Sequence, residues 1–285
     1  MKKVLITGAN SGFGFLMTLK FARNGYKVFA STRSLEKDGV KTISEISKKE
    51  NLQIEWLVFD VCDIEKIQEE MKKIDSLDIL INNAGFGKVG EIENFSDEDL
   101  QNQLDTNFVG MHRMIIFALP LLKKSKGKII NISSIAGIVT TKNYGIYSSS
   151  KFAIEGYSES LRLEMKKYGI KVFLVEPGSF PTNFEKNKSR PNIVLQENLK
   201  IENVKVSISN QNQNDEKDLN PFVQKFLNFF RKNDPEKVSE IVFKIAEGKI
   251  TKFRNLVGKD AVLLAFLRKL LPNSLWDFLS WKSIK

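Results

Sequence analysis

The sequence predicts an α/β protein with a mostly parallel sheet, on three observations. Short apolar runs alternate with helical patterns through the first two thirds of the 285 residues. A glycine-rich turn follows the first apolar run, and polar side chains follow several of the later ones. Such alternation is typical of a doubly wound, Rossmann-like sheet with helices on both faces. With 42% hydrophobic residues, the chain can form one large domain or two small ones.

The first apolar run, residues 2–7, predicts a buried strand, and a helical pattern follows at residues 15–24. Strand, glycine turn and helix are the setting in which backbone N–H groups bind a phosphate. Gly8 permits the tight turn, Gly12 lets the backbone approach a pyrophosphate, and Gly14 lets the helix pack closely on the strand. We therefore expect a nucleotide site here; the alternative is an ordinary glycine-rich turn.

A second strand at residues 27–31 completes a βαβ unit and indicates the cofactor. NAD-binding units of this kind hold the ribose 2′-hydroxyl with an acidic residue at the end of this strand. Here the strand runs into Ser31, Thr32 and Arg33, with no acid among them. An arginine suits a 2′-phosphate through charge-assisted contacts, so NADP(H) is expected in preference to NAD(H). The alternative is that Arg33 is a solvated loop residue and that either cofactor binds.

Two helices and two strands are expected next, in alternating order, at residues 35–49, 54–59, 64–74 and 77–81. Polar residues follow both of these strands. Asp60 follows the first and could accept a bond from adenine, while residues 82–85, Asn-Asn-Ala-Gly, follow the second. Ligands of open α/β sheets lie beyond the carboxyl ends of the strands, which places both groups well. The alternative for each is a helix cap or a turn residue.

The second half continues the alternation with a long helix, a strand, a second long helix and a strand. They are expected at residues 99–122, 128–132, 147–167 and 171–175. Ser133 and Ser134 follow the first of these strands, and Tyr147 and Lys151 lie in the opening turn of the next helix. A strand's carboxyl end and the start of the next helix meet at one rim of the sheet, so these side chains can converge.

Tyr147 and Lys151 are four residues apart and therefore share one face of a helix. A free phenol, with a pKa of about 10, transfers protons poorly at neutral pH, and a fixed positive charge beside it lowers that pKa. Such a pair suits proton transfer to or from an alcohol or carbonyl oxygen. The alternative is a surface tyrosine and a solvated lysine, because the Y-x-x-x-K spacing alone is common.

Taken in this order, the motifs resemble those of the short-chain dehydrogenase/reductase (SDR) family, over about residues 3–182. The matches are T-G-x-x-x-G-x-G at 7–14, Asp60, N-N-A-G at 82–85, Asn107, Ser134 before x-A-G, Y-x-x-x-K at 147–151 and P-G-x-x-x-T at 177–182. The resemblance implies hydride transfer between a nicotinamide cofactor and an alcohol or carbonyl substrate.

The resemblance also implies roles for single residues. Tyr147 would be the general acid in reduction and the base in oxidation, and Lys151 would lower its pKa and bind the nicotinamide ribose. Ser134, rather than Ser133, would polarise the substrate oxygen. Asn107 would anchor a water that links Lys151 to solvent. Cofactor contacts are expected from Gly8, Asn10, Ser11, Gly12, Phe13, Gly14, Arg33, Asp60, Asn83, Ala84, Gly85, Tyr147, Lys151, Pro177, Gly178 and Thr182.

Composition argues against several other classes of protein. With one cysteine, Cys62, no internal disulfide is possible, which fits a reducing compartment. One histidine, His112, and one cysteine cannot form an ordinary zinc site; His112 is expected to pack or hydrogen-bond, and Cys62 to be a small buried or capping residue. The net charge of +10 comes with no nucleic-acid recognition motif. No signal peptide or membrane span is predicted, so a cytoplasmic location is expected.

The C-terminal third is less patterned. Residues 183–220 are polar and predict a loop, which the resemblance makes a substrate lid. An aromatic helix at 222–230 could serve the core or the wall of an apolar pocket. A helix from Asp234 to Glu247, with Pro235 at its first position, and a strand at 253–257 follow. We divide the chain into a cofactor-binding and catalytic core (1–182), a lid with the end of the same domain (183–257) and an amphipathic extension (258–285).

The extension carries apolar runs, two tryptophans and five basic against two acidic side chains. Such a segment can pack on its own domain or a partner subunit, or it can lie on a membrane surface. With the Ser-Thr-Arg stretch it resembles the hydroxysteroid/retinol dehydrogenase-like branch, which suggests a lipophilic alcohol or ketone. A homodimer or homotetramer, formed through the helices bearing Asn107 and Tyr147, is implied by the resemblance. The alternative to an enzyme is a catalytically silent NADP(H)-sensing protein.

Overall fold

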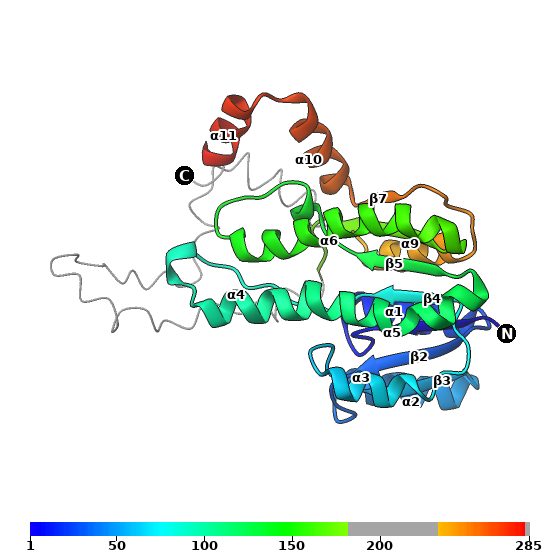
Figure 1. Ribbon diagram of the computed structural model, residues 1–285. Helices are drawn as coiled ribbons and strands as arrows, with labels where there is room; N and C mark the ends of the chain where they lie inside the picture. The colour runs from blue at the N-terminus through cyan, green and yellow to red at the C-terminus, as the bar shows by residue number, and fades with distance from the viewer. Residues whose placement is uncertain (182–232, 283–285) are drawn as a thin grey trace.

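The computed structural model describes residues 1–181 and 233–282, which form one parallel seven-stranded sheet with helices on both faces (Figure 1). The strand order is β3-β2-β1-β4-β5-β6-β7, and every pair is parallel. This order confirms the predicted doubly wound α/β class, in a single domain. The reversal of strand order beside β1 creates the crevice where such sheets bind ligands.

Each of the seven predicted strands is present. They are β1 (Lys3–Ile6), β2 (Lys27–Thr32), β3 (Ile54–Val58), β4 (Ile79–Asn82), β5 (Lys128–Ile132), β6 (Lys171–Pro177) and β7 (Arg254–Val257). The α-helices are α1 (Gly12–Arg23), α2 (Asp38–Glu50), α3 (Ile64–Met71), α4 (Asp97–Leu104), α5 (Gly110–Ser125), α6 (Gly145–Met165), α9 (Glu236–Ala246), α10 (Lys259–Leu270) and α11 (Asn273–Lys282). Shorter turns of helix are η1 (Ile92–Asn94), η2 (Asp105–Val109), η3 (Ile135–Gly137) and η4 (Lys166–Tyr168).

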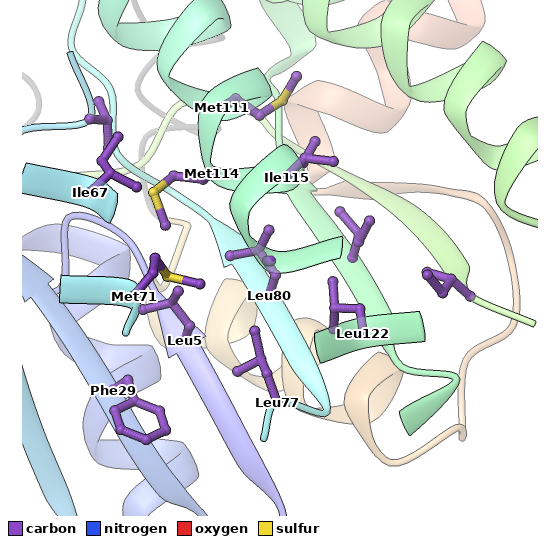
Figure 2. Close-up of a cluster of buried hydrophobic side chains, with 14 of the residues drawn as sticks. Leu5, Phe29, Ile67, Met71, Leu77, Leu80, Met111, Met114, Ile115 and Leu122 are labelled. Atoms are coloured by element: carbon purple, nitrogen blue, oxygen red, sulfur yellow. The ribbon is translucent and has the colours of Figure 1, made fainter. Parts of the chain in front are cut away.

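The core lies on both faces of the central strands, which are mainly apolar. Alternate side chains of β1 point to opposite faces, so Leu5 packs with α3, α5 and α6, whereas Val4 and Ile6 pack with α1 and α9. Figure 2 shows the first of these clusters, in which Met114 and Ile115 of α5 lie over the sheet. A core on both faces fixes the carboxyl ends of the strands along one edge, and that edge carries the predicted site.

The helix predicted at residues 99–122 is divided in the structure. It begins earlier, at Asp97, because Ser96 and Asp99 form a reciprocal capping box. At Asp105–Val109 the chain widens into a π-helical turn, η2, before α5 begins. Such turns are frequent at functional sites, and this one contains Asn107. No residue type marks a π-turn, so the apolar spacing predicted a single regular helix here.

Other helix starts differ from the prediction as well. Helix α1 begins at Gly12 rather than at residue 15, and α2 begins at Asp38 rather than at residue 35. Two further shifts concern α6 and α9. Helix α6 begins at Gly145, so Tyr147 is its third residue rather than its first. Pro235 immediately precedes α9 instead of occupying its first position, because the carboxylate of Asp234 accepts a bond from the Glu236 amide (3.0 Å). Both shifts leave the predicted faces of the helices unchanged.

The extension forms two helices, α10 and α11, which project beyond β7 at the edge of the sheet opposite β3 (Figure 1). Among the described residues, no helix combines the length and apolar character needed to cross a membrane. The polar loop predicted at 183–220 and the aromatic helix at 222–230 lie outside the described residues, so the lid and the division into core, lid and extension stay predictions.

Candidate active site

The glycine turn lies between β1 and α1, at the carboxyl edge of the sheet. Gly8 and Gly12 have φ angles of +64° and +52°, which an L side chain rarely adopts. At Gly14 an added Cβ would stand 2.1 Å from the Gly8 carbonyl oxygen, so only glycine lets α1 approach the turn this closely. The three N–H groups at the start of α1 face the same edge, where an anion is stabilised.

The segment after β4 braces this turn. The Thr7 hydroxyl accepts bonds from the amides of Asn83 and Ala84 (both 2.9 Å), and the Asn83 side chain donates to the carbonyls of Thr7 (2.9 Å) and Gly8 (3.1 Å). Asn83, Ala84 and Gly85 are therefore brought beside the glycine turn, as expected of residues that share a ligand.

The segment after β6 reaches the same place. The ring of Phe13, in the first turn of α1, meets Phe180 edge to face at 5.5 Å, which joins the start of α1 to the loop after Pro177, the last residue of β6. Asn10 and Ser11 directly precede α1. The Gly178 amide donates to the Val257 carbonyl (2.8 Å). Pro177 and Gly178 are thus placed at the predicted site, whereas Thr182 lies outside the described residues.

Arg33 and Asp60 lie side by side where β2 and β3 end. Their closest charged atoms, Nη1 and Oδ2, are 3.9 Å apart, and the Arg33 side chain is 75% exposed. Asp60 is more firmly held, because its Oδ1 accepts the Cys62 amide (2.9 Å). The guanidinium is therefore loosely paired and free to turn toward a phosphate.

Tyr147 and Lys151 lie together on the buried side of α6, each with 7% of its surface exposed. Lys151 Nζ donates to the Ile132 carbonyl (2.9 Å) and stands 5.8 Å from the centre of the Tyr147 ring. Burial lowers the pKa of Lys151 to about 8, because a desolvated ammonium is disfavoured, while the charge of Glu155 acts in the opposite direction. The fold therefore makes this lysine unlike a surface lysine.

Ser134 follows β5, on the segment that packs against α6. Its hydroxyl accepts a bond from the Ala136 amide (3.1 Å) and contacts the Pro177 carbonyl at 3.5 Å. Ser133 points elsewhere, since its Oγ is buried beside the position that a Cβ on Gly137 would occupy. Ser134, and not Ser133, is thus next to the predicted cofactor loop.

Asn107 is fully engaged by protein groups. Its side chain accepts from the Phe86 amide, donates to the Phe86 carbonyl and donates to the Ser150 hydroxyl, each at 3.0 Å. A cavity of about 10 Å³ lies next to it, lined also by Thr7 and Asn82, whose buried Oδ1 finds no partner among the described residues. That volume is close to the minimum for one water. The water-anchoring role of Asn107 stays a prediction.

Other site contacts join residues far apart in sequence. The Asp260 carboxylate, at the start of α10, accepts the Ser179 amide and the Asn233 side chain, and Asn233 donates to the Ser179 carbonyl (3.0 Å). A Cβ on Gly178 would stand 2.2 Å from Asp260. Ser150 and Asp260 were not predicted, because their partners lie 43 and 81 residues away. No cluster of possible metal ligands is found in residues 1–181 or 233–282.

The predictions for His112 and Cys62, the one histidine and the one cysteine of the chain, have different outcomes. His112 hydrogen-bonds through Nδ1 to the Tyr157 hydroxyl (2.8 Å), which confirms the structural role expected of it. The expectation of a buried Cys62 is wrong. Its side chain is exposed in the turn that precedes α3, with Sγ 3.6 Å from the Thr106 hydroxyl. The Asp60 side chain, not Cys62, closes this turn.

Comparison with known proteins agrees with this geometry. A family model described as short chain dehydrogenase matches residues 2–192. The 3-ketodihydrosphingosine reductase of Bacteroides thetaiotaomicron is 40% identical over 191 residues, which are 65% of this chain and 66% of that protein. The probable short-chain type dehydrogenase/reductase VdlC of Helicobacter pylori is 36% identical over 284 residues, covering 96% and 95% of the two chains.

A solved structure of a short-chain dehydrogenase has a similar fold over nearly the whole chain. The short-chain dehydrogenase of Streptomyces avermitilis superposes with a TM-score of 0.75 at 26% identity, covering 98% of this chain and 95% of that one. The chain belongs to the short chain dehydrogenase family of oxidoreductases.

Proposed function

We propose that the protein is an NADP(H)-dependent oxidoreductase that interconverts an alcohol and its carbonyl compound, with Tyr147 as the general acid and base. The observation that carries this proposal is the burial of Lys151 beside Tyr147, with Nζ 5.8 Å from the ring and fixed on the Ile132 carbonyl. An enclosed ammonium next to a phenol stabilises the phenolate that proton transfer leaves behind.

Each residue then has a defined task. In reduction, Tyr147 donates its hydroxyl proton to the carbonyl oxygen, and Ser134 donates a hydrogen bond that holds that oxygen in place. Lys151 stabilises the phenolate and binds the ribose. Asn107, fixed by Phe86 and Ser150, anchors a water. When bound, the nicotinamide cofactor supplies the hydride in reduction and accepts it in oxidation.

The residues fit this cofactor. Gly8 and Gly12 have positive φ angles, and α1 approaches the turn closely at Gly14. The backbone of such a turn can approach a pyrophosphate and bind it. NADP(H) is favoured over NAD(H) because Arg33 is exposed, weakly paired and unaccompanied by an acid on β2. The proposed cofactor contacts are Gly8, Asn10, Ser11, Gly12, Phe13, Gly14, Arg33, Asp60, Asn83, Ala84, Gly85, Tyr147, Lys151, Pro177, Gly178 and Thr182.

A lipophilic substrate is supported by a hollow of about 520 Å³ beside α10, which Val262, Leu263 and Phe266 line with apolar surface. Asn233, which also lines the hollow, shares the Asp260 carboxylate with the Ser179 amide, and this contact links the hollow to the loop after β6. The Bacteroides relative is a reductase of 3-ketodihydrosphingosine, a ketone with a long alkyl chain. We infer a ketone or alcohol of comparable apolar character.

We also propose a homodimer or homotetramer formed through α5 and α6. Ile116 and Phe152, on these helices, are 48% and 46% exposed, and a partner subunit docked on α5 and α6 would bury them. Light scattering of the purified chain at micromolar concentration is expected to give twice or four times the monomer mass. A monomer at this concentration would refute the assembly and leave the site unaffected.

Peripheral membrane contact through the tail is a further part of the proposal. On α10, Val262, Phe266 and Leu270 recur every four residues and are 52%, 58% and 61% exposed, with basic Arg268 and Lys269 beside them. Co-sedimentation with phosphatidylserine vesicles, reversed by Leu270→Ser at a position that does not line the hollow, is the expected result. If the protein stays in the supernatant, this face of α10 packs on its own domain or binds a protein partner. The proposed location is then cytoplasmic without membrane contact.

The test of the enzymatic proposal follows nicotinamide absorbance with aliphatic, aromatic, steroid and long-chain ketones and NADPH or NADH. Turnover with NADPH on an apolar ketone is expected, and weaker turnover with NADH. Tight NADPH binding with no turnover on any carbonyl would favour a silent NADP(H)-sensing protein. No nucleotide binding at all would reject both.

A further inference from the structure

One turn of α6 beyond Lys151 lies a buried group of charged side chains that the proposed function does not use. Arg254, the first residue of β7, contacts three carboxylates: Glu155, Glu176 (Nη1–Oε1, 3.1 Å) and Glu159 (Nη2–Oε2, 3.1 Å). Glu155 and Glu176 are 5% and 0% exposed, whereas the Glu159 side chain is 59% exposed. Two of the three carboxylates are therefore enclosed with a single guanidinium.

The enclosed charges do not balance if both carboxyl groups are ionised. Glu155 Oε1 and Glu176 Oε2 are buried and have no hydrogen-bond partner within the described part of the chain. Burial and the charge of Glu155 raise the pKa of Glu176 to about 7. Near neutral pH, Glu176 therefore holds a proton for much of the time. Burial raises the pKa of Glu155 as well, and the ion pair with Arg254 acts against that rise and favours the charged form of Glu155.

Glu155 faces Lys151 across one turn of α6, the spacing at which side chains of a helix interact. Among residues 1–181 and 233–282, no carboxylate forms an ion pair with Lys151, whose Nζ is fixed on the Ile132 carbonyl of β5. The Tyr147 ring centre is 5.8 Å from Nζ, and a Cβ added to Gly137 would stand within 3.0 Å of the Glu155 side chain, the Ser133 hydroxyl and the Lys151 carbonyl oxygen, so these groups meet beside η3. The Glu155 carboxylate favours the ammonium form of Lys151, whereas burial disfavours it.

We propose, building on the oxidoreductase function above, that Glu155 is a positioning residue: its carboxylate, fixed by Arg254, keeps Lys151 as an ammonium ion beside Tyr147. Glu155 contacts neither substrate nor cofactor in this account and acts only through Lys151. Arg254 counteracts the rise that burial causes in the pKa of Glu155, and Glu176, whose pKa is raised to about 7, is the carboxyl group that holds a proton near neutral pH.

The sign of the pH effect follows directly. Reduction needs the form in which both Tyr147 and Lys151 are protonated, and this form is lost as pH rises through the pKa of Lys151. Glu155→Gln keeps the shape of the side chain and removes its charge, so the pKa of Lys151 falls further. The alkaline limit of kcat/KM for NADPH-dependent reduction is expected to move to lower pH by about one unit. Activity at pH 8 then falls about fivefold, with little change at pH 6.

The matched control is Glu159→Gln, which also removes a carboxylate from Arg254 but at the exposed position. It is expected to keep the wild-type limit, and Glu155→Asp, which keeps the charge, is expected to restore it. The NADPH dissociation constant at pH 6 is expected to stay within about twofold in all three, which a general loss of structure would not allow. If Glu155→Gln melts below the assay temperature, Arg254→Gln replaces it, since an unpaired Glu155 would become protonated.

An alkaline limit that is the same in Glu155→Gln and Glu159→Gln would overturn the proposal while the oxidoreductase function stands. A fall in activity that is equal at all pH values would also overturn it, because it indicates a packing role. Absence of wild-type turnover on every carbonyl would overturn the proposed function, and this inference with it.

Discussion

The pKa of Lys151 is set by the buried position that the fold gives this side chain. A lysine at the surface is a cation throughout the physiological range, but here burial lowers the pKa to about 8. The spacing of Tyr147 and Lys151 was visible in the sequence because the two residues share one helix. Their burial was not, because it depends on β5 and β6 packing over that face of α6.

At the same scale, Arg33 is predicted to select the cofactor. Arg33→Ala removes the cation that would contact a 2′-phosphate, and a charged hydrogen bond contributes about 1.5–3 kcal/mol. We expect kcat/KM with NADPH to fall about 10- to 100-fold and kcat/KM with NADH to stay nearly constant. Steady-state kinetics with both nucleotides measures this directly.

The control for this prediction is Arg23→Ala. Arg23, the last residue of α1, is bonded to Glu50 at 2.7 Å on the surface, and its loss should leave both values unchanged. If Arg33→Ala lowered NADPH and NADH kinetics equally, Arg33 would be a structural residue and not the selector.

Contacts between residues that are far apart in the sequence could not be predicted from local sequence patterns. Arg254 joins carboxylates that lie 78 to 99 residues earlier, and Asp260 fixes Ser179 across 81 residues. No local pattern indicates such pairs. One signal was present and was not used: Glu155 stands four residues after Lys151, as Lys151 stands four after Tyr147.

Among the elements, the glycine turn and the first helix were predicted almost completely, because their requirements are local. Strand, left-handed turn and helix follow one another within the first 23 residues. The long helix around Asn107 was predicted as an element but not in its form. The π-turn η2 directs Asn107 onto the Phe86 backbone, and this choice depends on a partner from another segment.

The close packing of α1 on the glycine turn predicts how a substitution at Gly14 changes the free energy of unfolding. Gly14→Ala places Cβ 2.1 Å from the Gly8 carbonyl oxygen, so α1 or the turn has to move. We expect a loss of about 3 kcal/mol in the free energy of unfolding, measured with urea. NADPH affinity should fall with it, because the turn is distorted.

Gly156→Ala is the matched substitution. Gly156 also lies in a helix, α6, but an added Cβ would meet nothing within 4 Å. Here the better helix propensity of alanine should stabilise by about 0.5–1 kcal/mol. Equal effects at the two positions would show that the close approach at Gly14 does not govern the stability of this unit.

For the whole molecule, the class of fold and all seven strands followed from alternation of apolar runs with helical patterns, because a parallel sheet buries its strands on both faces. The placement of α10 and α11 did not follow. Their exposed apolar residues are compatible with packing or with a membrane, and periodicity is the same in both cases. The segment 183–232 was predicted as lid and aromatic helix, and these stay predictions.

Buried carboxyl groups make the stability of the whole molecule depend on pH. The pKa of Glu176 is raised to about 7 in the folded protein from an ordinary value of 4.5. Its contribution to stability is therefore complete below about pH 4.5 and is lost as pH rises to about 7. Glu176→Gln removes this loss, so its melting temperature should fall less than that of the wild type between pH 5 and 8.

Thermal melts of the nucleotide-free protein across this range measure the difference. Glu159→Gln serves as control, since Glu159 contacts the same Arg254 from the exposed side and should follow the wild-type curve. Parallel curves for the wild type and Glu176→Gln would show that Glu176 is ionised in the folded protein at neutral pH.

The central claim is that Tyr147 transfers the proton in a hydride-transfer reaction. Its most direct test compares Tyr147→Phe with the wild type in kcat/KM for an accepted ketone and in the NADPH dissociation constant. We expect kcat/KM to fall about 1,000-fold, while NADPH binding stays within about twofold because the ring is retained. A Tyr147→Phe variant that turns over at the wild-type rate would contradict the claim.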